Sequence, residues 1–172
     1  MIDFNWGIAL GPVKEEYLPK MLEWRNDSRI RQWCRQYDII QPWAHKKWYE
    51  SLANRDDVRM YAIINTHGKV VGICGLTNID QLNQRAEFSL YIGPEYQRHG
   101  YGFKALSTLI DHGFRNLNLH TIWGESYDKN PACGLFEAVG MGKEGTRRNF
   151  YFRDGAFLDA HLYSVVRSEW KQ

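Results

Sequence analysis

The decisive stretch of this sequence reads Leu90-Tyr91-Ile92-Gly93-Pro94-Glu95-Tyr96-Gln97-Arg98-His99-Gly100-Tyr101-Gly102-Phe103. A strand pattern runs through a glycine-bearing loop directly into a long helical pattern. The first turn of a helix has N–H groups without intrahelical partners, and the helix dipole makes that end electropositive. Because glycine lets a ligand approach the backbone closely, the stretch predicts a cradle for an anion such as a pyrophosphate.

The spacing within this loop is Q-x-x-G-x-G, formed by Gln97, Gly100 and Gly102. It is neither the GxGxxG of dinucleotide-binding folds nor the GxxxxGK[ST] of P-loops. The loop also lies in the middle of the chain, after several predicted strands, and not after the first strand of a βαβ unit. Both of those nucleotide-binding folds are therefore disfavoured.

Hydrophobic periodicity extends the pattern in both directions. Helical spacing predicts helices over residues 14–33 (in one or two pieces), 43–53, 100–116 and 130–139. Alternation and turn signals predict strands over residues 6–10, 58–65, 70–76, 85–92, 120–125, 148–152 and 157–166. This order predicts an α/β (α+β) fold with a mixed central sheet of six to seven strands and helices on both faces. No repeat or linker interrupts the chain, so residues 1–172 are expected to form a single domain.

A second motif follows the loop, with the sequence Asn130-Pro131-Ala132-Cys133 and then Leu135-Phe136-Glu137-Ala138-Val139-Gly140-Met141. Together with the loop and the order of the elements, it resembles the GNAT superfamily of acetyl-coenzyme A-dependent N-acetyltransferases over nearly the whole chain. The stretch Trp24-Arg25-Asn26-Asp27, with Ile30-Arg31, resembles the RimJ/RimL-type branch and, within it, the nucleotide-sugar (PseH-like) enzymes. The resemblance implies the GNAT fold, in which two neighbouring strands splay apart at the cofactor site.

The resemblance implies acetyl-CoA as the co-substrate and assigns residues to it. The backbone of Leu90, Tyr91 and Ile92 would pair with the pantetheine arm like an added strand. The pyrophosphate loop starts at Gln97, and its N–H groups would come from Arg98, His99, Gly100, Tyr101, Gly102 and Phe103. Asn130 would hydrogen-bond the pantetheine region, and it is at the same time a good cap for the helix that follows.

Acetyl transfer to an amine needs a base for the amine and benefits from a proton donor for the departing thiolate. Glu87 is the candidate base, because it lies on the strand that leads into the loop; an exposed side chain or a structural ion pair is the alternative. The resembled family commonly has a tyrosine on the second helix, where this chain has Phe136. Tyr127 and Cys133 remain as candidate acids, beside a purely structural thiol for Cys133 and protonation by solvent.

Trp24, Arg25 and Asn26 are candidates for the acceptor pocket, with core packing and solvated surface as the alternatives. The predicted function is acetyl transfer to a primary amine of a small molecule, such as an amino sugar or a nucleotide-linked amino sugar. Two other functions stay open: RimJ/RimL-like acetylation of protein N-termini, and a non-catalytic module that binds acyl-CoA. Because dimers are frequent among similar proteins, a homodimer is also implied.

The composition argues against several other classes. The chain has 172 residues, is 44% hydrophobic and carries a net charge of +2, which indicates neither a nucleic-acid partner nor a membrane partner. No apolar stretch approaches the roughly 20 residues that span a bilayer, and no signal peptide is predicted. The 3 cysteines are widely spaced and form no CxxC pair. No disulfide framework and no metal site are therefore predicted, and a cytoplasmic location is expected.

Overall fold

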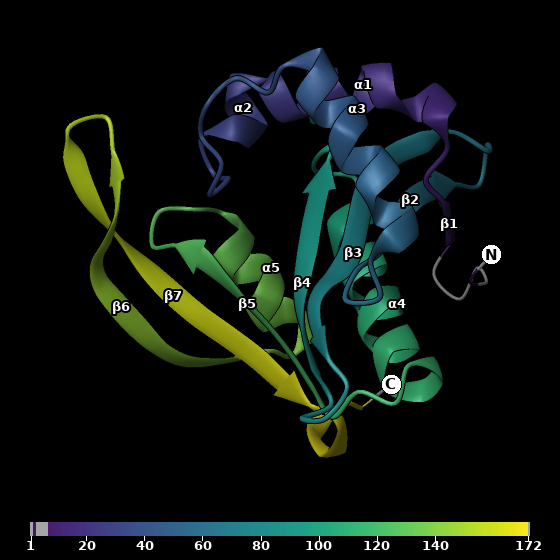
Figure 1. Cartoon of the computed structure of the whole chain (residues 1–172). Coiled ribbons are helices and arrows are strands. Elements are labelled where there is room, and N and C mark those ends of the chain that lie inside the picture. The colour runs from purple at the N-terminus through teal and green to yellow at the C-terminus, as the bar shows by residue number, and fades with distance from the viewer. Residues whose placement is uncertain (1, 3–6, 172) are drawn as a thin grey trace.

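The computed structural model describes residues 2 and 7–171 (Figure 1). The strand predicted to begin at Trp6 is formed by Ile8–Pro12. Trp6 itself lies outside the described residues.

The described residues form a seven-stranded mixed sheet in the order β1-β2-β3-β4-β5-β7-β6. Its strands are β1 (Ile8–Pro12), β2 (Arg59–Asn65), β3 (Val70–Asp80), β4 (Arg85–Ile92), β5 (Thr121–Tyr127), β6 (Gly142–Arg153) and β7 (Ala156–Val166). Neighbouring strands are antiparallel except for β4 and β5, which are parallel. The sheet confirms the predicted mixed architecture.

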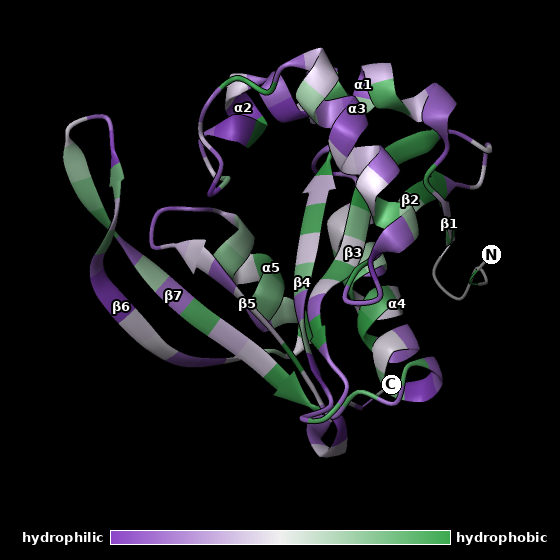
Figure 2. Ribbon diagram, in the orientation of Figure 1, coloured by the Kyte–Doolittle hydropathy of each residue, from purple (hydrophilic) through white to green (hydrophobic). Residues whose placement is uncertain are grey.

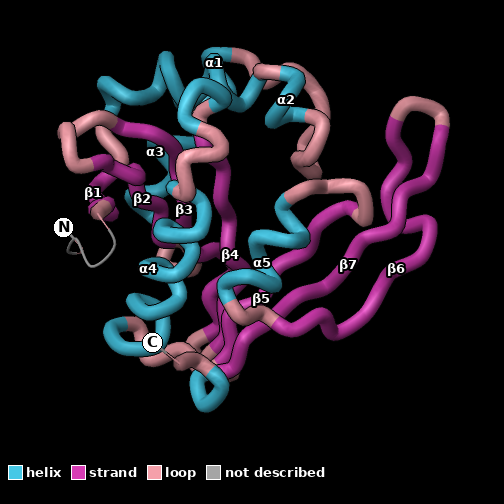
Figure 3. The backbone as a smooth tube through the Cα atoms, turned by 180° about the vertical axis from the view of Figure 1, so that it is seen from behind, coloured by secondary structure: helices cyan, strands magenta, loops and turns pink. Residues whose placement is uncertain are grey.

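Helices lie on both faces of the sheet. On one side are α1 (Leu18–Asn26), α2 (Ser28–Arg31) and α3 (Pro42–Ser51); on the other are α4 (Tyr101–Asn116) and α5 (Ala132–Val139), which cross in front of the strands when the molecule is seen from behind (Figure 3). Short 3₁₀ turns occur at Glu15–Tyr17, Leu52–Asn54, Pro94–Tyr96 and Arg167–Glu169.

Two apolar clusters hold these layers together. Leu18 and Met21 of α1 pack against Ala62 and Ile73 of the sheet. On the opposite face, α4 buries the apolar stripe that its 3.6-residue periodicity predicted, with Leu106, Leu109, Ile110 and Phe114 in the main core.

The largest difference from the sequence prediction is in β6. The strand begins at Gly142, whereas alternation predicted residue 148. Its pairing with β7 shifts register twice, between Lys143 and Gly145 and between Arg147 and Tyr151. Each shift interrupts the alternation of apolar and polar side chains from which a strand is predicted. Most of this edge strand is also exposed and hydrophilic (Figure 2), so it has little apolar pattern to detect.

The feature that positions the site is the parting of β4 from β5. Their parallel pairing covers only Arg85↔Thr121, Ala86↔Ile122 and Glu87↔Trp123. Both strands then continue, β4 to Ile92 and β5 to Tyr127, and they diverge as Figure 1 shows. The implied splay is therefore present.

Phe88 is the first residue of β4 beyond this last pair. Its ring lies against Gly124, where a methyl group would overlap it, and meets Phe136 of α5 edge to face at 4.9 Å. The absence of a side chain at Gly124 lets the ring occupy the start of the gap.

A Gly124→Ala substitution should test this packing. The added methyl group must displace the ring of Phe88, so the free energy of unfolding should fall by about 1–3 kcal/mol. Denaturant unfolding measures the change. Gly145→Ala on β6 is the control, because its Cβ would meet open space, and it should shift stability by no more than about 0.5 kcal/mol. Equal effects of the two substitutions would contradict this account.

Candidate active site

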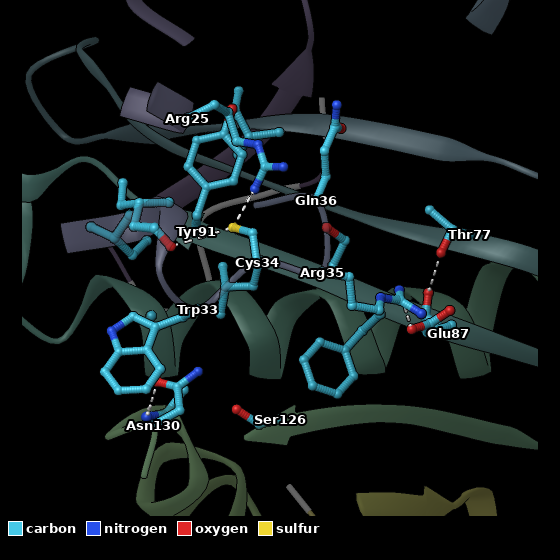
Figure 4. A pocket seen from close by; sticks show the side chains of 18 of the residues that line it. Arg25, Trp33, Cys34, Arg35, Gln36, Thr77, Glu87, Tyr91, Ser126 and Asn130 are labelled. Carbon is cyan, nitrogen blue, oxygen red and sulfur yellow. Dashed lines mark hydrogen bonds and ion pairs between the residues drawn. The ribbon is translucent and has the colours of Figure 1, made fainter. Parts of the chain in front are cut away.

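A cleft of about 790 Å³ opens where β4 and β5 part (Figure 4). Residues from both strands, from the segment between α2 and α3, and from the start of α5 surround it. Among the lining residues are Arg25, Trp33, Arg35, Glu87, Phe88, Leu90, Tyr91, Ile92, Gln97, Gly102, Glu125, Ser126, Asn130 and Phe136. The cleft therefore touches both the acceptor side and the cofactor side that the sequence predicted.

The predicted cofactor residues divide into two groups. Leu90, Tyr91, Ile92, Gln97, Gly102 and Asn130 line the cleft, whereas Arg98, His99, Gly100, Tyr101 and Phe103 belong to the adjoining turn and the first turn of α4 without lining it. In that turn, Arg98 and Gly100 have positive φ angles of 61° and 77°. Gly100 is the N-cap of α4, so the helix end faces this loop as predicted.

Two polar side chains of this region already have structural partners. The amide of Gln97 donates to the carbonyl of Ile92 at 3.2 Å. Asn130 caps α5 by accepting a hydrogen bond from the backbone N–H of Ala132 at 3.0 Å. Its capping role is therefore present, and its amide group also borders the cleft.

On the acceptor side, two buried carboxylates are joined by one guanidinium. Glu87 and Glu125 have side chains that are 3% and 5% exposed, and Arg35 lies 2.5 Å from the first and 3.6 Å from the second. Burial opposes the charge of Arg35, but the two carboxylates outweigh it and raise its pKa. Asn78 donates a further hydrogen bond to Glu87 at 2.8 Å. Of the two alternatives to a base at Glu87, the exposed side chain is wrong, and the structural ion pair is present, with Arg35 of the segment between α2 and α3.

Glu125 was not identified from the sequence, because the register between β4 and β5 is known only from the structure. Glu87 pairs with Trp123, and side chains two residues apart share a face of a strand, so Glu125 lies on the same face as Glu87. Arg147 donates to Glu125 at 2.9 Å, and the hydroxyl of Tyr151 also donates to it. Burial, and then this hydrogen bond, raise the pKa of Tyr151 to about 12. Arg35 lies in a loop with no recognisable pattern, so nothing in the sequence indicated it.

The two predicted acids do not line the cleft. Tyr127 is 2% exposed; its hydroxyl donates to the carbonyl of Cys34 at 3.2 Å and accepts from Arg153 at 2.8 Å. The thiol of Cys133 contacts the carbonyl of Tyr127 at 3.5 Å. Phe136, which has no hydroxyl, lies in the cleft wall instead.

The three predicted acceptor residues also separate. Arg25 lines the cleft, with its guanidinium 5.7 Å from the ring centre of Tyr91. Trp24 is 2% exposed and donates to Glu95. Asn26 exchanges two hydrogen bonds with the backbone of Ile40, at 2.8 and 2.9 Å. Trp24 and Asn26 therefore act in the fold and do not line the cleft.

The tip of the β6–β7 hairpin holds the segment that carries Arg35. Arg153 donates to the carbonyls of Cys34 and Arg35, at 3.2 and 2.7 Å. The hydroxyl of Tyr37 donates to Asp154 at 2.8 Å, and this hydrogen bond raises the pKa of Tyr37. Residues 34–37, called here the strap, are thus tied to the hairpin tip over the acceptor side of the cleft.

Two features are absent from the described part of the chain. No group of three or more His, Cys, Asp and Glu side chains is arranged to hold a metal ion. None of its helices is both long enough and apolar enough to cross a membrane.

Residues 8–141 match the family model described as an acetyltransferase (GNAT) domain. Because this match covers most of the chain, the protein belongs to the GNAT N-acetyltransferase family. It is 29% identical to the uncharacterized N-acetyltransferase p20 of Bacillus licheniformis, over 88% of this chain and 83% of p20. It is 28% identical to the putative ribosomal N-acetyltransferase YdaF of Bacillus subtilis, over 94% of this chain and 91% of YdaF.

A solved structure confirms the fold class. The spermidine N-acetyltransferase of Vibrio cholerae, in complex with CoA and spermine, superposes with a TM-score of 0.89 at 22% identity. The alignment covers 96% of this chain and 99% of that one. The predicted GNAT fold is therefore correct.

An Arg153→Met substitution should release the strap. It removes hydrogen bonds to two backbone carbonyls and to Tyr127, and hydrogen bonds from a charged donor each contribute about 1.5–3 kcal/mol when buried. Trypsin should then cleave after Arg35 several-fold faster than in the unmodified protein, as followed by mass spectrometry. Arg148→Met, at an exposed position of the same strand, should leave the rate unchanged. An unchanged rate in Arg153→Met would show that other contacts hold the strap.

Proposed function

We propose that this protein transfers the acetyl group of acetyl-CoA to a primary amine of a small, cationic molecule. The observation that carries the proposal is the position of Glu87 at the fork between β4 and β5, with a second buried carboxylate beside it. The fork leaves room for a thioester between the strands, and the carboxylates suit a positively charged amine.

The residues around the gap fit acetyl-CoA. Beyond Glu87, the backbone of β4 has no strand partner on the β5 side, so its groups there are open to a pantetheine arm. The N-terminus of α4 follows after the Gly100 turn and suits the pyrophosphate. Gly102 packs closely against α5, since a Cβ there would lie 3.1 Å from Leu135. Acetyl-CoA, when bound, supplies the activated acetyl group.

Glu87 is proposed to take the proton that the acceptor ammonium must lose before its nitrogen can attack. In the free protein both oxygens of this carboxylate are engaged, one by Arg35 and one by Asn78. Arg35 lies against one of these oxygens, so an acceptor amine that binds to the same oxygen would displace it. A cationic amine can replace it, because an ammonium group carries the same charge and offers three donors.

Acetylation of a protein N-terminus is the second candidate. Its support is the similarity to YdaF over nearly the whole chain, which agrees with the predicted RimJ/RimL-type branch. The carboxylate pair favours the small cationic amine, and the likeness to a spermidine acetyltransferase is consistent with it. Of the two acceptors that the sequence first suggested, a free amino sugar is also cationic at neutral pH, whereas a nucleotide-linked amino sugar is anionic because of its phosphates.

The test is calorimetric titration with acetyl-CoA, followed by thiol-release assays with spermidine, glucosamine, a nucleotide-linked amino sugar and a short peptide. Micromolar binding of acetyl-CoA with turnover of spermidine or glucosamine would support the proposal, whereas turnover of the anionic nucleotide-linked amino sugar alone would contradict a cationic acceptor. Turnover of the peptide alone would favour N-terminal acetylation, and binding without any turnover would favour the acyl-CoA-binding module. Absence of binding would refute all three. Sedimentation of the same sample tests the implied homodimer.

A Glu87→Gln substitution should lower kcat/KM for the accepted amine by about 10²–10⁴-fold, the usual contribution of a general base. The affinity for acetyl-CoA should stay the same. Glu50→Gln, at an exposed position of α3, controls for loss of a carboxylate. If kcat/KM is unaffected, the assignment of Glu87 is wrong.

An Arg35→Ala substitution tests the exchange of Arg35 for the acceptor. Without the competing guanidinium, the KM for the cationic amine should fall by about tenfold, which corresponds to about 1.4 kcal/mol. Arg29→Ala is the matched control, because Arg29 also lines the cleft but pairs with Asp27. If KM instead rises in Arg35→Ala, Arg35 contacts the bound acceptor directly. It would then not be a group that occupies the acceptor's position only in the free protein.

A further inference from the structure

The resemblance to the family implies a tyrosine on α5 as the proton donor, and this chain has Phe136 at the corresponding position. The ring of Phe136 has no hydroxyl and packs between Phe88 and Tyr163. Tyr127 and Cys133 lie outside the cleft and have partners elsewhere. A donor for the sulfur must therefore come from another part of the cleft wall, or from solvent.

One buried hydroxyl in the cleft wall has no partner. Ser126 is 6% exposed, lines the cleft, and its Oγ forms no hydrogen bond with any described residue (Figure 4). Buried polar groups in proteins are nearly always hydrogen-bonded, so such a group calls for an explanation. A ligand in the cleft can supply the partner.

The strand register places Ser126 beside the path expected for the pantetheine arm. Glu87 is paired with Trp123 in the parallel ladder, so three residues further along, Leu90 and Ser126 face each other across the gap. The arm would run from the N-terminus of α4 back along β4 toward Glu87. The sulfur, at the end of the arm, would then lie in the part of the gap that Ser126 borders.

Ser126 and Glu87 also lie on opposite faces of the sheet. Side chains alternate along each strand, so Ser126 shares a face with Ile122, which packs in the α4–α5 core. Glu87 shares the other face with Tyr91, which packs in the cluster of α1. A thioester in the gap would have the base on the acceptor side and this hydroxyl on the cofactor side.

We propose that the hydroxyl of Ser126 donates a hydrogen bond to the sulfur of coenzyme A as the acetyl group leaves. The inference rests on the proposed function, because it requires the thioester to lie between β4 and β5. The acceptor ammonium loses one proton to Glu87, and its nitrogen forms the new C–N bond. The C–S bond breaks, its electron pair goes to sulfur, and the sulfur takes the second proton lost by the nitrogen. Ser126 keeps its own proton and stabilises the thiolate until that proton arrives.

The experiment measures the thiol pKa of bound coenzyme A from the ultraviolet absorbance of its thiolate, with no acceptor present. A donor to the thiolate lowers that pKa, so the value should be about one unit higher in Ser126→Ala than in the unmodified protein. Ser89→Ala is the matched control, because it removes a hydroxyl from the same cleft on the acceptor face, and it should leave the pKa unchanged. Equal pKa values in the unmodified protein and Ser126→Ala, or an equal shift in Ser89→Ala, would overturn the proposal.

Two further measurements separate a contact with sulfur from a general effect on the fold. Desulfo-coenzyme A should bind equally well to the unmodified protein and to Ser126→Ala; weaker binding to the variant would overturn the assignment to sulfur. With the accepted amine, Ser126→Ala should lower kcat about tenfold or more without changing KM, and Phe136→Tyr in that background should restore part of the rate. If the unmodified protein binds no coenzyme A at all, the proposed function itself fails and this inference falls with it.

Discussion

The short parallel ladder between β4 and β5 is the constraint on which the rest of the site depends. Three residue pairs hold the two strands together, and beyond Glu87↔Trp123 the strands part. A sheet normally pairs the backbone groups of its inner strands. Here the inner edge of β4 is left open, with the N-terminus of α4 a short loop away. The separation of β4 from β5 produces the cleft. A ligand that lies between the two strands can therefore contact side chains from both faces of the sheet.

The buried carboxylates impose a second constraint. Glu125 is paired with Arg147 at 2.9 Å, but an unpaired charge on Glu87 at this depth would be costly, so the free protein needs a cation beside Glu87. Arg35 supplies it from a side chain that is 53% exposed. A partly exposed guanidinium can return to water at a smaller cost than a buried one. This makes Arg35 suited to give way to an incoming amine, while the strap that carries it stays tied to the β6–β7 hairpin.

The two faces of the sheet then have different roles. The acceptor face carries Glu87 and Glu125, together with Tyr91 and the helices α1 to α3. The opposite face carries Phe88 and Ser126, and α4 and α5, with Phe136 on α5, lie against it. Phe88 connects the start of the gap with α5, because its ring lies against Gly124, where β4 and β5 begin to part, and also packs on Phe136 of α5.

The sequence by itself determined the order of the elements, the mixed sheet and the loop before α4, because these depend on periodicity and on glycine and asparagine signals that act over a few residues. It also indicated Glu87, since this residue lies on the strand that enters the loop. It could not show that Trp24 and Asn26 serve the fold or that Tyr127 is held by Arg153. Nor could it show that Arg35 joins two carboxylates 52 and 90 residues further along the chain, or that the hydroxyl of Ser126 is buried without a partner. Only the tertiary structure decided these points, because burial and charge pairing depend on which distant segments meet, and local sequence patterns carry no record of that.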